Sequence, residues 1–275
     1  MLEGQASPQG ERDPIVSRVR WFLLAYLLVG ILLVNLLVLL GLTENYDDVQ
    51  KLELAVYVIT AAMMAVARTS LRDFRIDRFS IILFIVFGTV LRIPPQSALS
   101  SAFGPIYYAF GLIALLLAGV VLRSRENRAG LAGTDWRWLV LGLFMGVVLA
   151  LVLGTFASVF SRGNIRLQAA WPITTGGLFL TFLYHMGHSA ILEEPAFRGF
   201  LWGYLEKHRW HPASIWQLQA VLFWLAHLRY IERPFTFWIA LPVGGLMFGW
   251  LSWKSRSISA SLLAHAAYNT VGAFF

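Results

Sequence analysis

The sequence predicts an all-α protein, a polytopic bundle of transmembrane helices. Of its 275 residues, 58% are hydrophobic and 13% are charged, with a mean hydropathy of +0.65, whereas soluble domains are about half apolar and a quarter charged. The basic residues behind the net charge of +7 lie in short blocks between long apolar stretches, a distribution typical of membrane proteins. We therefore expect the lipid bilayer, and no nucleic acid, as a partner.

The lack of cysteine narrows the chemistry further. A chain without cysteine is not a disulfide-stapled secreted domain, and it has neither thiolate metal ligands nor a cysteine nucleophile. Any catalytic site must be built from other polar groups.

Six apolar stretches are long enough to cross a bilayer, which takes about 20 residues; they are 21–42, 103–122, 138–160, 172–192, 236–253 and 257–275. Three shorter stretches, 52–67, 79–91 and 215–228, are expected to be tilted, re-entrant or extended by flanking residues. We expect about nine spans, with eight as the alternative. Close helix packing is indicated by three glycine pairs, Gly142/Gly146, Gly199/Gly203 and Gly245/Gly249.

The distribution of Lys and Arg predicts the orientation. With nine spans, the blocks richest in these residues fall on one side of the membrane, which the positive-inside rule assigns to the cytoplasm. These blocks are 12–20, 68–78, 123–137, 207–209 and 254–256. We expect a cytoplasmic N-terminus and, because the loops are short, a prokaryotic inner membrane. Residues 72–78 are predicted to form an interfacial amphipathic turn that grips anionic headgroups.

Two adjacent glutamates, Glu193 and Glu194, lie between apolar segments. A carboxylate at membrane depth is costly, so it normally faces a polar interior and has a partner. Arg198 follows Glu194 by four residues, which favours an ion pair on a helix, and Glu193 is then the less compensated carboxylate. Such a group is suited to general-base work. The alternative is a salt bridge that only locks two helices together.

Two further apolar spans carry isolated polar side chains. His227 lies in one of them, and His265 and Asn269, four residues apart on one helix face, lie in the other. At a rise of 1.5 Å per residue, the glutamates and these three groups lie roughly 12–21 Å from the nearest cytoplasmic boundary. We therefore expect all of them to meet in an intramembrane polar site.

The other histidines have simpler interpretations. His185 and His188 precede the glutamates in the same span and are expected to hydrate or hydrogen-bond the wall of the site, with metal binding as the alternative. His208 and His211 lie in a basic loop and are expected at the surface.

The polar groups resemble three motifs of the CAAX protease and bacteriocin-processing (CPBP) family, which includes the type II CAAX prenyl endopeptidases. Glu193-Glu194-Pro-Ala-Phe-Arg198 resembles EExxxR, Phe223-Trp-Leu-Ala-His227 resembles FxxxH, and His265-Ala-Ala-Tyr-Asn269 resembles HxxxN. The three motifs occur in this order, each in its own span. One departure is Pro195, which follows the glutamates where an aliphatic residue is expected, and proline can kink a helix.

The resemblance implies an intramembrane endopeptidase that cuts near the end of a membrane-associated protein or peptide, either prenylated or membrane-anchored. It implies that Glu193 activates water with the help of His227 and that His265 and Asn269 stabilise the oxyanion. It also implies that Glu194 and Arg198 support Glu193, with Phe223 as a further supporting residue. The chain would comprise a disordered cytoplasmic tail over 1–17, N-terminal transmembrane helices over 18–165 and a CPBP-like catalytic core over 166–275.

Two points stay open at this level. No cofactor is expected, although Glu193, His227 and His265 also have the donor set of a zinc site with an open position for water. The alternative functions are a catalytically silent immunity or binding protein and, with less support, a proton- or cation-coupled transporter.

Overall fold

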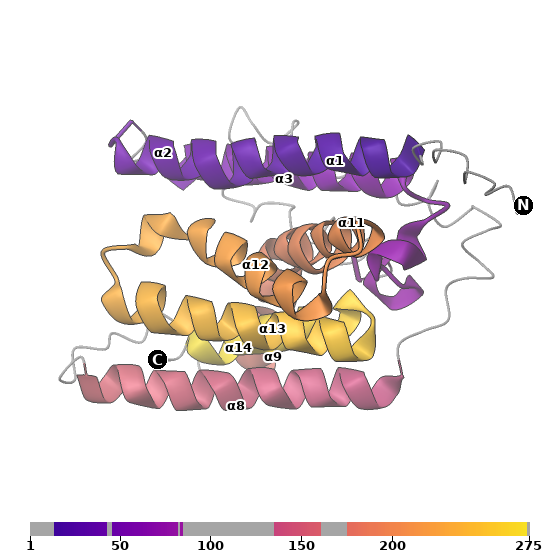
Figure 1. The fold of residues 1–275 in the computed structure, drawn as a ribbon. Coiled ribbons are helices and arrows are strands. Elements are labelled where there is room, and N and C mark those ends of the chain that lie inside the picture. Colours follow the sequence, from indigo (N-terminus) through magenta and orange to yellow (C-terminus); the bar gives the residue numbers. More distant parts are fainter. Residues whose placement is uncertain (1–13, 43–45, 82, 85–134, 161–174, 274–275) are drawn as a thin grey trace, which may run out of the picture.

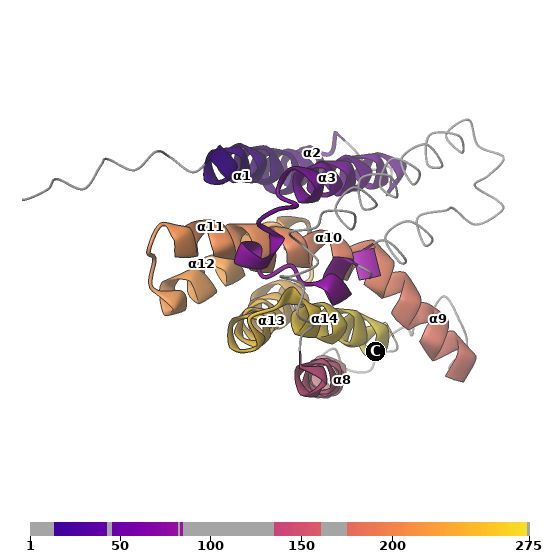
Figure 2. The same cartoon turned by 90° about the vertical axis from the view of Figure 1, so that its right-hand side faces the viewer.

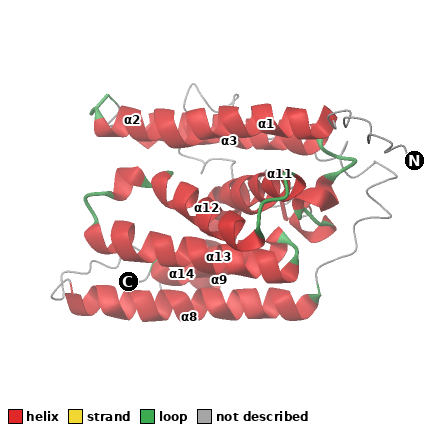
Figure 3. Ribbon diagram, viewed as in Figure 1, coloured by secondary structure: helices red, strands yellow, loops and turns green. Residues whose placement is uncertain are grey.

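The structure, a computed structural model, describes residues 14–42, 46–81, 83–84, 135–160 and 175–273. Every regular element within these ranges is helical and none is a strand (Figure 3), which confirms the all-α class. The predicted span 103–122 and most of 79–91 lie outside the described residues, so the total number of spans stays a prediction. The first helix begins at Pro14, and residues 14–17 of the predicted tail are therefore helical.

The helices are stacked in layers whose order differs from their order in the chain (Figure 1). One outer layer holds α1 (Pro14–Tyr26), η1 (Leu27–Leu33), α2 (Val34–Leu39) and α3 (Tyr46–Val66). The other outer layer is α8 (Trp136–Phe160). Between them lie helices of the C-terminal part: α10 (Ile191–Glu194), η4 (Pro195–Leu201), α11 (Trp202–Lys207), α12 (Pro212–Leu225), α13 (Leu241–Ser255) and α14 (Ile258–Gly272). The second view shows the same stacking from the side (Figure 2). N-terminal segments therefore cover the C-terminal ones on two sides.

Three helices of the described part are long and apolar enough to cross a membrane: Pro14–Leu39, Trp136–Ser158 and Thr236–Ser255. They correspond to the predicted spans 21–42, 138–160 and 236–253. Large apolar side chains spaced three or four residues apart are exposed on the two outer helices, namely Leu24, Leu28, Leu32 and Leu36 on the first and Val140, Phe144, Val148 and Leu151 on α8. Exposed apolar stripes of this kind suit contact with lipid tails, as expected of a membrane protein.

One helical path carries both glutamates. Helix α9 (Thr175–His185) continues through the π-helical stretch η3 (Met186–Ala190) into α10, η4 and α11, so the predicted span 172–192 extends past the glutamates to Lys207. The π-helical stretch η4 begins at Pro195, whose ring removes the N–H that a regular α-helix would use. Pro195 therefore widens the helix without ending it.

The predicted glycine pairs are sites of close packing, as expected. A Cβ added at Gly142 of α8 would lie 2.3 Å from the carbonyl oxygen of Ala260, and one at Gly146 would lie 2.2 Å from that of Ala264. Because no Cβ atom fits at such distances, α8 contacts the backbone of α14 directly beside His265. The other two pairs likewise face the 73–76 segment and α12.

The interpretation of residues 72–78 as an interfacial turn is wrong for two of its charges. Arg72 and Arg78 are exposed, but Arg75 and Asp77 are buried. Arg75 donates to the carbonyl oxygen of Ser252 at 2.8 Å and pairs with Glu206 at 3.2 Å. The charge of Arg75 therefore binds protein groups near the ends of α11 and α13 rather than lipid headgroups.

Asp77 anchors the start of α14. Its carboxylate accepts hydrogen bonds from the hydroxyl groups of Ser80, Ser257 and Ser259. The hydroxyl of Ser257 also accepts from the backbone N–H of Ser259 and so caps the helix. The 71–81 segment thus fixes the helix that carries His265 and Asn269.

Candidate active site

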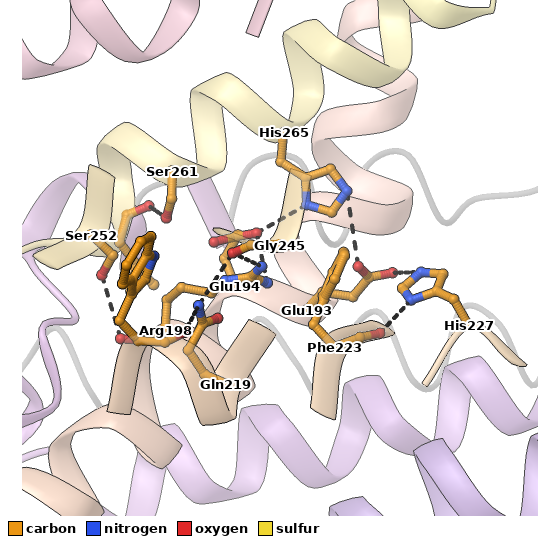
Figure 4. A network of polar contacts seen from close by, with 12 residues as sticks. Glu193, Glu194, Arg198, Gln219, Phe223, His227, Gly245, Ser252, Ser261 and His265 are labelled. Carbon is orange, nitrogen blue, oxygen red and sulfur yellow. Dashed lines mark hydrogen bonds and ion pairs between the residues drawn. The ribbon is translucent and has the colours of Figure 1, made fainter. Parts of the chain in front are cut away.

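Three chain segments bring the predicted polar residues together (Figure 4). Glu193 and Glu194 end α10, His227 follows the last turn of α12, and His265 lies midway along α14. The four side chains form one contiguous polar cluster. The convergence expected from their depths is therefore observed for these four side chains, and the cluster has two unlike halves.

The first half is the predicted ion pair of Glu194 and Arg198. Both side chains are 0% exposed, and Nη1 of Arg198 lies 3.3 Å from Oε1 of Glu194. The guanidinium also lies 4.3 Å from the ring centroid of Phe223 and donates to the carbonyl oxygen of Gly245 at 3.4 Å. Buried charges are tolerated when they are paired and hydrogen-bonded in this way.

Glu194 also contacts His265, which differs from the role implied for it. Its Oε1 lies 2.9 Å from Nδ1 of His265, whereas it was expected to support Glu193. A carboxylate at this position fixes the orientation of the imidazole and places a proton on Nδ1. Phe248 stacks against the same ring at 4.7 Å between centroids. His265 is thus held on two sides.

The second half is formed by Glu193 and His227. The side chain of Glu193 is 19% exposed, and its Oε1 lies 3.6 Å from Nε2 of His227 while its Oε2 lies 3.9 Å from Nε2 of His265. Both separations exceed a hydrogen bond. Among the described residues, no hydrogen-bond donor reaches Oε2 of either glutamate, but Oε1 of Glu194 has partners at 2.9 and 3.3 Å. Glu193 is the less compensated of the two carboxylates, as predicted.

The tautomer of His227 follows from its other contact. Nδ1 of His227 lies 2.8 Å from the carbonyl oxygen of Phe223, and because a carbonyl only accepts, Nδ1 carries the proton. When the ring is neutral, Nε2 presents a lone pair toward the carboxylate of Glu193. A water molecule beside such a pair of acceptors, 3.6 Å apart, can donate one hydrogen to each of them.

Phe223 and Asn269 complete the predicted set. The ring of Phe223 lies 4.6 Å from that of His227 and 5.9 Å from that of His265, so this residue of the second motif separates the histidines from Arg198. Asn269 is partly buried, one helical turn after His265 on α14.

The other four histidines are His185, His188, His208 and His211. The ring of His185 packs edge-on against Tyr184, and the side chain of His188 is outside the described residues. His208 and His211 are exposed, as predicted. His211 caps α12 by accepting from the backbone N–H of Ala213.

A metal ion at this site would be held by the same residues. Glu193, His227 and His265 have the right donor atoms for zinc, but within the described ranges no group of three or more His, Asp or Glu side chains is arranged to hold a metal ion.

Sequence reasoning missed Phe248 and Gln219. Nε2 of Gln219 donates to the carbonyl oxygen of Gly245, which Arg198 also contacts. Phe248 is one of 20 phenylalanines, and no pattern singled it out. Gln219 carried a usable signal, because it is an uncharged polar residue within the predicted span 215–228.

Comparison with known proteins gives one match. Residues 175–271 match the Rce1-like family, described as type II CAAX prenyl endopeptidase Rce1-like. No curated protein and no solved structure matches the chain. The matched segment contains all three motifs and every residue of the polar cluster. The comparison therefore confirms the resemblance drawn from the motifs: the segment 175–271 is similar to the type II CAAX prenyl endopeptidases, a family of membrane proteases.

Proposed function

We propose that this protein is an intramembrane endopeptidase in which Glu193 activates water to hydrolyse a peptide bond near the end of a membrane-associated substrate. The observation that carries the proposal is the pair of acceptors formed by Glu193 and Nε2 of His227, 3.6 Å apart, in a partly exposed position. Such a pair binds the two hydrogens of one water molecule and directs its oxygen outward.

In the proposed reaction, the water oxygen bonds to the substrate carbonyl carbon while Glu193 takes a proton from it. The carbonyl oxygen becomes an oxyanion, which accepts hydrogen bonds from Nε2–H of His265 and the side-chain amide of Asn269. Nε2 of His265 donates only while the ring also keeps its proton on Nδ1, beside Glu194. The carbon–nitrogen bond then breaks, and the proton held by Glu193 passes to the leaving amine.

The two neighbours of Glu193 have different roles in this scheme. His227 orients the water, and its own orientation is fixed by the carbonyl oxygen of Phe223. Glu194 and Arg198 act on His265 instead of Glu193, because Glu194 contacts that ring directly. No step of this reaction requires a cofactor, since Glu193 is itself the base.

The substrate class and the membrane setting belong to the same proposal. The family similarity supports a prenylated or membrane-anchored protein or peptide as substrate. We propose that this chain is a multi-pass protein with a cytoplasmic N-terminus, on the distribution of its basic blocks, and that it lies in a prokaryotic inner membrane, on its short loops.

The test is hydrolysis of a peptide panel by the detergent-purified protein, with and without a chelator. The panel contains prenylated C-terminal peptides and unmodified membrane-anchor peptides. We expect cleavage of at least one class of peptide, which survives chelation and is lost in His227→Gln. The matched control is His208→Gln, at an exposed histidine, which should keep the wild-type rate. Cleavage that depends on a metal would contradict the proposed role of Glu193. Binding of a peptide without turnover would favour a silent binding protein, and pH-driven ion flux in vesicles would favour a transporter.

A further inference from the structure

Asn35 is a polar residue buried in the apolar first span. It lies in α2, within the candidate membrane helix Pro14–Leu39, and is 3% exposed. An uncharged but strongly polar side chain at such a position needs hydrogen-bond partners within the protein. The residue lies far outside the segment 175–271 that matches the Rce1-like family, so the family similarity assigns it no role.

Nδ2 of Asn35 donates to the carbonyl oxygen of Ile31, one turn earlier in its own helix, at 2.6 Å, and its other partners come from the C-terminal part of the chain. Its Nδ2 donates to the carbonyl oxygen of Ala226 at 3.1 Å and to that of Leu225 at 3.3 Å. Its Oδ1 accepts from the backbone N–H of Arg229 at 2.9 Å. These three backbone groups lie within two residues of His227, on both sides of it.

The backbone at His227 needs such support, because α12 ends at Leu225 and a short 3-10 helix, η5 (Leu228–Tyr230), follows. Carbonyl groups in the last turn of a helix have no partners in the helix itself. Asn35 supplies a donor to these carbonyls and an acceptor to the N–H that follows. One side chain therefore holds both sides of the turn on which His227 sits.

The side chain of His227 is anchored separately, by Nδ1 to the carbonyl oxygen of Phe223 at 2.8 Å. The backbone anchor from Asn35 and this ring anchor together determine where Nε2 points. From these contacts we infer that Asn35 is a positioning residue, which sets the distance between Nε2 of His227 and Glu193. The inference rests on the proposed function, in which these two groups hold the attacking water.

The chemistry of an amide is required for this role. Leucine has a similar volume but neither donates nor accepts, and aspartate keeps the acceptor for Arg229 but turns a second oxygen toward the carbonyl groups of Leu225 and Ala226. Asn35→Leu and Asn35→Asp thus remove different parts of the same contact. Thr60 supplies a matched control, since it is a fully buried polar residue on α3 whose hydroxyl donates to the carbonyl of Val56 in its own helix.

The experiment compares kcat, KM and the melting temperature of Asn35→Leu, Asn35→Asp and Thr60→Val on a peptide that the wild type cleaves. We expect kcat to fall about 10- to 100-fold in both Asn35 variants, with KM changed by less than about threefold, because a small displacement of a reacting group costs rate and not binding. Thr60→Val should keep the wild-type kcat. An Asn35→Leu variant with wild-type kcat, or with losses explained entirely by a lower melting temperature, would overturn the inference.

Hydrogen exchange keeps this inference separable from the proposed function. In Asn35→Leu, the backbone amides of residues 226–233 should exchange faster while those of α14 stay protected, because Arg229 N–H has lost its acceptor. Unchanged exchange in that segment would overturn the inference even if Glu193→Gln is inactive. If the wild type cleaves no peptide, the proposed function fails, and the exchange result alone decides whether Asn35 fixes the turn at His227.

Discussion

The two halves of the polar cluster differ in how completely their groups are paired. Around Glu194, the carboxylate, Arg198 and His265 are all buried and within 3.3 Å of a charged or polar partner. Around Glu193, the nearest imidazole nitrogens lie at 3.6 and 3.9 Å and the side chain is partly exposed. Adjacent glutamates in one helix are thus placed in two environments, one buried and closely paired, the other partly exposed and more loosely paired.

The largest effect expected from this difference is on catalysis. Glu193→Gln should lower kcat by about 10²–10⁴-fold, because an amide cannot take the proton from water. Its melting temperature should stay near that of the wild type, since Glu193 has no short hydrogen bond to lose. Steady-state cleavage and thermal unfolding of the same preparation check both expectations. A large fall in melting temperature together with the fall in kcat would contradict this expectation, because Glu193 would then be needed for stability as Glu194 is.

The next effect is on stability. Arg198→Leu should lower the free energy of unfolding by about 3–5 kcal/mol, because it leaves the carboxylate of Glu194 buried without its cation. Denaturant or thermal unfolding in detergent measures the loss. Arg78→Ala, at an exposed arginine, is the matched control and should leave unfolding unchanged. A stable Arg198→Leu protein would mean that Glu194 does not depend on this pair.

A smaller effect on both cleavage and stability is expected from a substitution at the contact between α8 and α14. Gly146→Val should cost about 1–3 kcal/mol, because its side chain would overlap the backbone of Ala264 and displace the neighbouring His265. Cleavage should fall together with stability. Gly272→Ala lies in the same α14 with open space around its Cβ, and it should change neither the rate nor the unfolding temperature.

The smallest effect is expected at the surface end of α11. Glu206→Gln should cost less than about 1 kcal/mol, because Glu206 is half-exposed and its ion pair with Arg75 is screened by water. Arg75 also keeps its bond to the carbonyl oxygen of Ser252. A loss comparable to that of Arg198→Leu in thermal unfolding would show that exposure does not separate the two ion pairs.

Contacts within one helix could be predicted from the spacing of residues in the sequence. Contacts between helices could be predicted only coarsely. The pair Glu194–Arg198 followed from a separation of four residues, and the meeting of Glu193, His227 and His265 followed from similar depths. The contact of Glu194 with His265 could not be derived, because it depends on how α10 and α14 are rotated about their axes. The roles of the individual residues in catalysis stay predictions.

Two other sites show why local sequence patterns do not predict the partners of buried polar residues. Arg75 and Asp77 lie in a charged segment that has the composition of an interfacial turn, and only the packed fold reveals their buried partners. Asn35 carried a signal in the sequence, because it is an isolated amide in an apolar span. Its partners outside its own helix, however, are 190 to 194 residues away in the sequence, and no local rule connects them.

A single turnover in water labelled with heavy oxygen distinguishes activation of water by Glu193 from direct attack of its carboxylate on the substrate. Mass spectrometry of the first cleavage product then reports the source of the new carboxylate oxygen. If Glu193 activates water, we expect one heavy oxygen in the product and ordinary oxygen in Glu193. Ordinary oxygen in the product, with the label found in Glu193 afterwards, would contradict it, because the carboxylate would then have been the nucleophile.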